Sequence, residues 1–393
     1  NENTAVGDNA LGSATTSTAN TALGLHALLS TTTGDRNVAL GWKAMSVNID
    51  GDRSVAVGYA ALQNQEPASN VDMYNTAVGY TSMNATTTGV NNTAVGGFSL
   101  DANTTGNSNS AFGYSSLGAN TEGLRNVAMG AESLAANTTG DDNTALGEDA
   151  LASNTTADFN TAVGANALKA NTTGTNCTAV GYQASLANTT GGQNTSIGWN
   201  AFGTNTTGSD NTALGKRALH ASTTADNNTA VGNNCLLSNT TGEQNTSVGA
   251  LSLDAATTAD NNTAVGYNTL GANTTGHSNA AFGAFSMQTN TQSNRNTAFG
   301  YNTLASHNIG SDSNGYNTCI GFQAGSDITT GTQNTFIGGL VGDTNTTASN
   351  NVALGYNAFT ANTTGTENTA LGTDALETNV TAVDTSPTTS EYG

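Results

Sequence analysis

Side chains that could do acid–base or nucleophilic chemistry are few and widely separated in this sequence. The histidines and cysteines are His26, His220, His277, His307, Cys177, Cys235 and Cys319. A Ser-His-Asp site or a metal cluster needs several such side chains facing one another. We find no spacing that would bring them together. We therefore expect a protein that is not an enzyme and that uses no cofactor and no metal.

Carboxylates are more abundant, and they give the chain its charge. Asp and Glu number 28 against 8 Lys and Arg, so the formal net charge is -20 at pH 7. Most carboxylates lie in turn-like segments, as Asp141, Asp158 and Asp226 do. A calcium site needs several converging oxygen ligands, so we interpret these residues as turn formers, with weak cation binding as the alternative. The acidic balance argues against nucleic acid as a partner, and no apolar run reaches the roughly 18 residues of a membrane span.

A repeat of 17 residues organises the chain. Asn-Thr-Ala-Val-Gly, or a close variant, begins at residues 3, 20, 37, 54 and 75, then every 17 residues to 296, and again at 317, 334, 351 and 368. This makes 22 units, with four-residue insertions in units 54–74 and 296–316. We predict one repeat region over 3–384 and a C-terminal tail over 385–393. Positions in a unit are numbered 1 to 17 from its first residue.

The composition of each position predicts the fold. Position 5 is Gly and position 4 is apolar in all 22 units, position 3 is mostly Ala, and position 9 is mostly Leu. An invariant Gly indicates a positive φ or a close backbone approach, and frequent Gly and Thr oppose helix. We expect strands near positions 2–4 and 8–11, with turns at 5–7 and 12–17. Stacked units of this kind form an all-β parallel β-solenoid of 22 rungs with 17 residues each.

Positions 3 and 4 predict a second contact surface. They are neighbours in a strand, so their side chains point to opposite faces, yet both are apolar almost everywhere. An isolated solenoid needs only its inward face to be apolar. The pattern therefore favours a homo-oligomer packed around a shared axis. The alternative is a flattened monomer with one semi-exposed face.

The repeat also carries a resemblance. Units such as 160–174, N-T-A-V-G-A-N-A-L-K-A-N-T-T-G, resemble the repeats of phage and bacterial tail-fibre-domain proteins. They are similar to the head repeats of trimeric autotransporter adhesins, which carry a related Asn-Ser-x-Ala-Ile-Gly core. The resemblance covers about residues 3–384. It implies a left-handed, trimeric β-solenoid in an extracellular fibre, on a virion tail or a bacterial cell surface.

This resemblance implies a structural role. The chain would form a fibre or spike shaft, pair with itself as a homotrimer, and present an end that binds a host surface glycan or receptor. Insertions in solenoids become loops that often bind ligands, and exposed tyrosines suit glycan contact. The candidate surface-binding residues in the two insertions are Tyr74, Pro67, Tyr316 and His307. The alternative is that both loops are merely tolerated. Tyrosines at position 6 predict a sparse aromatic stripe outside the core.

Two other functions stay open. Thr ranks at positions 13 and 14, for example Thr172, Thr189 and Thr206, would suit an ice-binding solenoid. A polysaccharide-degrading phage spike would need a carboxylate pair about 5–10 Å apart in a groove, and the repeat offers no evident one. Asn171-Thr172-Thr173 is an N-glycosylation pattern that recurs in many units, and crowding on successive rungs argues for a phage or bacterial protein.

The cysteines have structural interpretations. Cys235 and Cys319 occupy positions 8 and 3, where Ala is usual, so we expect them to be buried. Cys177 replaces the Asn of position 1, and we expect it to be exposed beside a neighbouring ladder. Because the three occupy different positions, intrachain disulfides are not expected.

Overall fold

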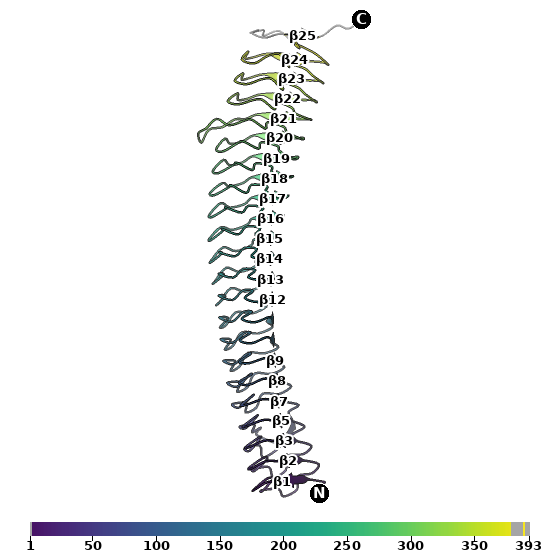
Figure 1. Ribbon diagram of the computed structural model, residues 1–393, viewed down its shortest axis with the longest axis vertical. Coiled ribbons are helices and arrows are strands. Elements are labelled where there is room, and N and C mark those ends of the chain that lie inside the picture. The colour runs from purple at the N-terminus through teal and green to yellow at the C-terminus, as the bar shows by residue number, and fades with distance from the viewer. Residues whose placement is uncertain (1, 379–387, 390–393) are drawn as a thin grey trace. The chain divides into compact units, whose positions relative to one another are not determined.

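The computed structural model describes residues 2–378 and 388–389. This part of the chain is all-β, contains no helix, and forms a parallel β-solenoid of about 22 turns at a spacing of about 17 residues. Within each of its two compact units, each turn contributes one three-residue strand that lies beside the strand of the next turn (Figure 1). The predicted fold class is confirmed.

The chain divides into two compact units, Asn1–Asn194 and Thr195–Gly393. The first unit contains β1 (Thr4–Val6), β2 (Thr21–Leu23), β3 (Val38–Leu40), β4 (Gly51–Asp52), β5 (Val55–Val57), β6 (Val71–Asp72), β7 (Thr76–Val78), β8 (Thr93–Val95), β9 (Ser110–Phe112), β10 (Val127–Met129), β11 (Thr144–Leu146), β12 (Thr161–Val163) and β13 (Thr178–Val180). The second contains β14 (Thr195–Ile197), β15 (Thr212–Leu214), β16 (Thr229–Val231), β17 (Thr246–Val248), β18 (Thr263–Val265), β19 (Ala280–Phe282), β20 (Thr297–Phe299), β21 (Thr318–Ile320), β22 (Thr335–Ile337), β23 (Val352–Leu354), β24 (Thr369–Leu371) and β25 (Thr388–Thr389).

Within each unit the strands pair in parallel and in register with the repeat. In β12 and β13, Thr161, Ala162 and Val163 lie opposite Thr178, Ala179 and Val180. The insertions do not disturb this register, because β5 pairs with β7 and β20 with β21 at the same positions. Of the predicted tail 385–393, Thr388–Thr389 pairs with β24, and the other tail residues, like 379–384 of the repeat region, lie outside the described residues.

The glycine of position 5 meets both conditions that its invariance predicts. Gly164 has a φ of +129°, and a Cβ built on it would lie 2.6 Å from the carbonyl oxygen of Gly181 in the next turn. Residues with a side chain rarely adopt this φ, and the close approach leaves no room for a methyl group. Each strand therefore ends at its glycine.

The second strand predicted near positions 8–11 is wrong. Positions 6–11 form a continuous turn, in which positions 7 and 9 adopt left-handed conformations, as at Asn166 (φ 59°) and Leu168 (φ 50°). The Leu168 amide still bonds to the next turn, donating to the Ala184 carbonyl at 3.0 Å. Non-glycine residues are uncommon in this conformation, so the sequence pattern gave little reason to expect it.

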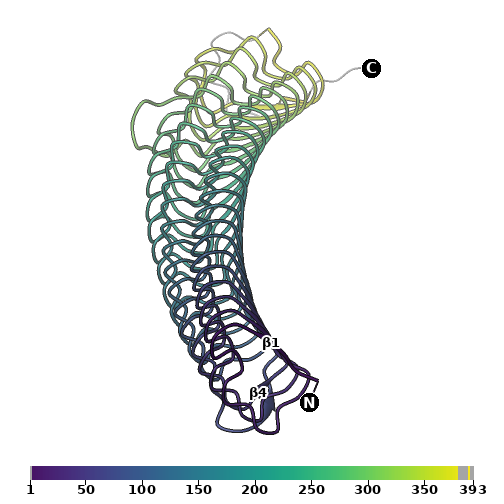
Figure 2. The same cartoon turned by 60° about the horizontal axis from the view of Figure 1, so that its bottom comes forward.

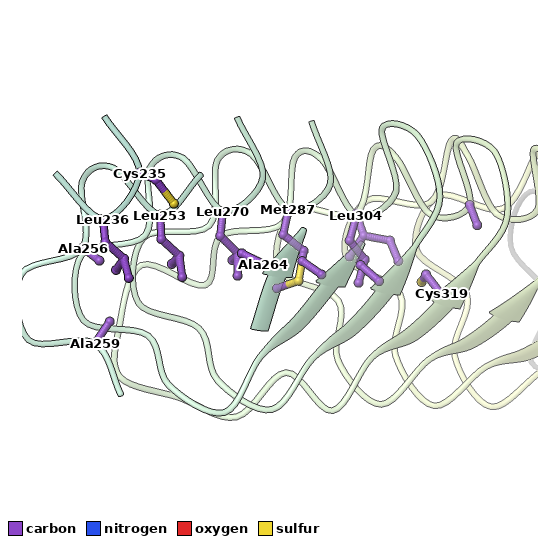
Figure 3. Close-up of a cluster of buried hydrophobic side chains, with 14 of the residues drawn as sticks. Cys235, Leu236, Leu253, Ala256, Ala259, Ala264, Leu270, Met287, Leu304 and Cys319 are labelled. Carbon is purple, nitrogen blue, oxygen red and sulfur yellow. The ribbon is translucent and has the colours of Figure 1, made fainter. Parts of the chain in front are cut away.

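The interior of each turn is filled by small and medium apolar side chains. Position 3 is buried alanine in most turns, and positions 8 and 9 add a buried Ala, Ser or Thr and a buried Leu or Met. In the second unit, Leu236, Leu253, Leu270, Met287 and Leu304 form one such row (Figure 3). Burying one leucine contributes about 2 kcal/mol, so a long narrow core forms by addition of turns.

Asparagine ladders satisfy the polar groups of the interior. At position 1, Asn126 donates from its backbone N–H to Asn109 Oδ1 at 2.9 Å and from Nδ2 to the Gly140 carbonyl at 2.8 Å. At position 12, Asn137 Nδ2 donates to Asn120 Oδ1 at 2.8 Å. Each side chain thus bonds to another turn, as the predicted Asn ladders require.

One unusually large side chain in the interior is accommodated by two unusually small ones. Phe336 replaces alanine at position 3 and is fully buried. Gly325 and Gly342 replace leucine at position 9, and a Cβ on Gly325 would lie 3.3 Å from Phe336 Cδ2, while one on Gly342 would overlap the same ring. The phenyl ring therefore occupies the space that two leucines fill elsewhere.

Candidate functional site

The outward side of the strands is the most extended candidate surface. We call the side chains at positions 2 and 4 of the strands the strand face. Position 3 is buried in every repeat after the first, whereas position 4 points outward, and Met129, Leu214 and Phe299 are 51%, 42% and 56% exposed. Within the described chain, none of the strands that occupy positions 2–4 contains a charged residue. The strand face therefore combines an apolar row at position 4 with mostly threonine at position 2, and it carries no charge on a strongly acidic protein.

Threonines occupy two different environments. At position 2, Thr161 and Thr178 lie on the strand face beside Val163 and Val180. At position 13, where the sequence suggested ice-binding ranks, Thr172 Oγ1 donates to the Thr189 carbonyl at 3.0 Å. Thr206 Oγ1 likewise donates a hydrogen bond to the Thr223 carbonyl at 3.0 Å. These position-13 hydroxyls close the turns, so they are not a free rank facing solvent.

The first insertion is fastened to the preceding turn. Tyr74 is 51% exposed, and its hydroxyl accepts a hydrogen bond from Arg53 Nη1 at 3.0 Å. Arg53 also pairs with Asp72 and lies over the Tyr74 ring, 5.6 Å from its centroid. The strand pair β4–β6 holds the base of this loop. Pro67 is buried, so of the two candidates here only Tyr74 is available to a ligand.

The second insertion uses the same anchor. Arg295 Nη1 donates to the Tyr316 hydroxyl at 2.9 Å and lies 5.8 Å from its ring centroid. Tyr316 is 49% exposed. The connection between β20 and β21, which contains this insertion, projects beyond the neighbouring turns (Figures 1 and 2).

His307 is not a surface residue, and its assignment to a binding loop is wrong in this respect. It occupies position 12, the place of the inner Asn ladder, and its side chain is fully buried. Neither ring nitrogen has a hydrogen-bond partner. Burial lowers the pKa of His307 to about 4, because the charged ring would lose its hydration.

The remaining histidines do not converge. His220 Nδ1 lies 3.3 Å from the Asn200 carbonyl, and its pKa is lowered by burial and then by the charge of Arg217. His277 lies 3.8 Å from Asp312. Among the described residues no group of three His, Cys, Asp or Glu side chains could hold a metal ion.

All three cysteines are free and buried. This confirms the prediction for Cys235 and Cys319. Burial raises the pKa of the Cys235 thiol to about 11. The expected exposure of Cys177 is wrong: its N–H donates to Asn160 Oδ1 at 2.9 Å, and its Sγ lies 3.4 Å from the Gly191 carbonyl oxygen. Cys177 thus takes the place of the ladder Asn inside the turn.

The turn carboxylates have a defined structural role. Asp158 Oδ1 accepts the backbone N–H of Asp141 at 2.7 Å, and Asp226 accepts that of Ser209 at the same distance. Arg125 donates to Asp142 and lowers the pKa of that carboxyl. Asn171 of the glycosylation pattern is fully buried and donates to the Gly174 carbonyl at 2.9 Å. In the folded chain its amide is therefore closed to an enzyme.

Aromatic side chains at positions 6 and 7 form the expected stripe outside the core. In the first unit Trp42 stacks on Tyr59, with ring centroids 4.6 Å apart, and Tyr59 stacks on Tyr80 at 5.0 Å. Phe98 and Tyr114 continue the row through edge-to-face contacts at 5.3 and 5.8 Å. We call these five residues the aromatic ladder. Its inner rings lie against one another, so their faces are largely occupied.

A recess opens beside the last ring of the aromatic ladder. It has a volume of about 480 Å³, and its lining includes Phe98, Tyr114, Asp101, Glu132 and Gly118. Burial raises the pKa of the Asp101 carboxyl. Sequence reasoning missed this recess, because a pair of carboxylates on different turns has no signature in the repeat.

Comparison of the chain with protein-family models and with curated proteins finds no match. The part of the chain that the structure describes contains no helix that could cross a membrane. Functional inference therefore depends on the strand face, the anchored loops and the recess.

Proposed function

We propose that this protein is the shaft of an extracellular fibre or spike, in a phage tail fibre or a bacterial surface adhesin. The shaft assembles as a homotrimer through the strand face and presents an end that binds a host or another surface. The observation that carries the proposal is the row of outward apolar side chains at position 4, repeated in each unit without a charge. Catalysis has no part in this role.

The energetics favour covering the strand face. Removing apolar surface from water contributes about 25 cal/mol per Å², and each turn repeats the same small gain. The net charge of -20 opposes association of identical chains. Because the contact face is uncharged, the carboxylates of two associated chains stay far apart. At physiological ionic strength, salt screens the repulsion between charges that are more than about 8 Å apart. A row that is apolar in every turn therefore suits a partner with the same period, which is a second copy of the chain.

Lysine substitutions on the strand face test this assembly. In the variant Met129→Lys, Leu146→Lys, Val163→Lys, three successive position-4 side chains become charged, and we expect the trimer to dissociate or weaken. The matched control is Thr139→Lys, Thr156→Lys, Thr173→Lys, which adds the same charge to exposed position-14 residues of the same turns. Native mass by light scattering after size exclusion is the readout. Equal masses for both variants would contradict the proposal.

Ice binding is the second candidate, and one observation favours it. Position-2 threonines lie on the strand face beside the position-4 apolar side chains, at the regular spacing of paired strands. Such a face could order water instead of meeting another chain. Thermal hysteresis of the purified protein separates the two functions. Our proposal predicts none, and hysteresis that Thr161→Lys and Thr178→Lys abolish would replace the shaft by an ice-binding solenoid.

A further inference from the structure

We propose that the recess beside Tyr114 is a binding site for a small ligand that carries an organic ammonium group. The site combines an exposed aromatic ring with two carboxylates, Asp101 and Glu132, and no cationic side chain lines it. The inference does not depend on the oligomeric state or on the role of the strand face.

A single missing side chain creates the recess. Asp101, Gly118 and Ala135 occupy position 10 in three successive turns, and all three line it. Gly118 leaves this row without a side chain, and a Cβ there would lie 3.6 Å from Asp101 Oδ1. The carboxylate therefore borders the open space instead of packing under a neighbour.

Tyr114 supplies an uncovered ring. It is the last member of the aromatic ladder and is 55% exposed. The next turn has Ala131 at position 6 and Glu132 at position 7, so no ring stacks beyond Tyr114. The end of the aromatic ladder at Tyr114 therefore faces the turn that carries Glu132. An aromatic face with a carboxylate beside it attracts a cation through both its quadrupole and the negative charge.

The chain itself places ammonium groups on comparable rings. At the other end of the aromatic ladder, Lys43 Nζ lies 4.4 Å from the Trp42 ring centroid. In the second unit Lys216 Nζ lies 5.4 Å from the Trp199 ring centroid. No cation–π contact is found at Tyr114 within the described residues. Lys169 bonds to Asp149 at 2.8 Å and also feels the charge of Glu132, but it does not line the recess.

The second unit provides an internal comparison. Asp254 and Gly271 repeat the Asp–Gly step of position 10, and Tyr267 repeats the tyrosine of position 6. There the Asn268 side chain occupies the space beside Gly271, and the Phe285 ring lies where Glu132 lies in the first unit. The recess in the first unit thus differs from its counterpart in the second unit in two features: the empty space beside Gly118 and the second carboxylate, Glu132.

Choline is a suitable probe, titrated into the full-length protein at low ionic strength and followed by saturation-transfer NMR and calorimetry. We expect weak, saturable binding. The neutral isostere 3,3-dimethylbutan-1-ol, which lacks only the charge, should not bind. Tyr114→Phe should retain affinity because the ring remains. Tyr114→Leu, and the pair Asp101→Asn with Glu132→Gln, should each lose about tenfold or more.

Matched controls separate this site from general attraction to an acidic chain. The pair Asp254→Asn with Glu243→Gln removes the same charge elsewhere and should leave choline binding unchanged. Gly118→Leu should block choline binding, whereas Gly271→Leu should not. Thermal melting checks that each variant is folded. The Tyr114 variants test the site independently of any glycine change.

Several results would overturn the inference. Equal binding of the neutral isostere, equal loss in the two charge-neutralised pairs, or full affinity in Tyr114→Leu would each do so. Release of new reducing ends from a polysaccharide, dependent on both Asp101 and Glu132, would make the recess an active site for glycan cleavage instead.

Discussion

Individual residues show how strictly each position of the turn is specified. Position 12 normally holds an Asn whose amide bonds to the backbone and to the adjacent turn, but in the turn with the second insertion it holds His307. Both ring nitrogens are buried without partners, which is costly for polar groups. The next turn has the buried Ile328 at the same position. An apolar side chain therefore fits this part of the interior.

Replacing His307 by Leu should stabilise the protein and reduce its acid sensitivity. The folded pKa is near 4 against 6.5 for an unperturbed His, so the unfolded chain binds a proton first. The protein therefore loses stability as the pH falls from 6.5 towards 4, and this acid-induced loss amounts to about 3 kcal/mol; above pH 6.5 it is absent. Urea unfolding midpoints of the wild-type and His307→Leu proteins at pH 7 and 4.5 measure this loss of stability. Asn290→Leu, which changes position 12 of the preceding turn and removes no titratable group, is the control and should leave the pH dependence unchanged. The same result for His307→Leu would contradict this explanation.

The ring of Phe336 and the glycine at 342 should be energetically coupled. Phe336→Ala leaves a cavity and should cost about 3–5 kcal/mol, and Gly342→Leu should be destabilising because its side chain overlaps the ring. Together they restore the usual Ala and Leu of the repeat, so the double variant should be more stable than the sum of the single changes predicts. A double-mutant cycle on urea midpoints measures this coupling. Strict additivity would show that the Phe336 ring and position 342 are not energetically coupled.

At the scale of the element, the turn after each strand is what the repeat encodes most strongly. Gly164 and its equivalents combine a φ that only glycine tolerates with contact to the next backbone. The sequence period thus predicted the strand, its register and its end. It did not predict the left-handed Leu168, because local propensity disfavours this conformation and the stacked turns impose it.

Gly164→Ala should therefore destabilise the protein by about 1–3 kcal/mol or more, since a methyl group there would lie 2.6 Å from a carbonyl oxygen. The comparison is Gly97→Ala at position 6, where the nearest atom to a new Cβ would be Tyr114 Cδ2 at 3.9 Å and where the chain itself places Ala131 and Ala165. Thermal melting of both variants is the measurement. Equal losses would mean that φ at position 5 is not the reason for its invariance.

The candidate sites were harder to predict than the elements. Tyr74 and Tyr316 are exposed as expected, but the arginines that fasten them lie one turn earlier, and only the stacked structure pairs them. Pro67 and His307 belong to the insertions in sequence yet are buried. The recess depends on what Gly118 lacks. A missing side chain becomes visible only when adjacent turns are placed together.

For the molecule as a whole, the strand face and the charge act in opposite directions. Each chain carries a net charge of -20, so association should strengthen as salt screens the repulsion, while the apolar contact itself changes little. The oligomer should accordingly be more stable to dilution at physiological salt than at low salt. This dependence is opposite to that of a complex held together by ion pairs.

The native mass of the particle in solution tests the central claim most directly. Light scattering coupled to size exclusion at physiological salt should give three times the chain mass of 39.2 kDa, because three strand faces are then covered around one axis. A mass of 39.2 kDa over the accessible concentration range would mean that the strand face meets water, and it would contradict the trimeric shaft.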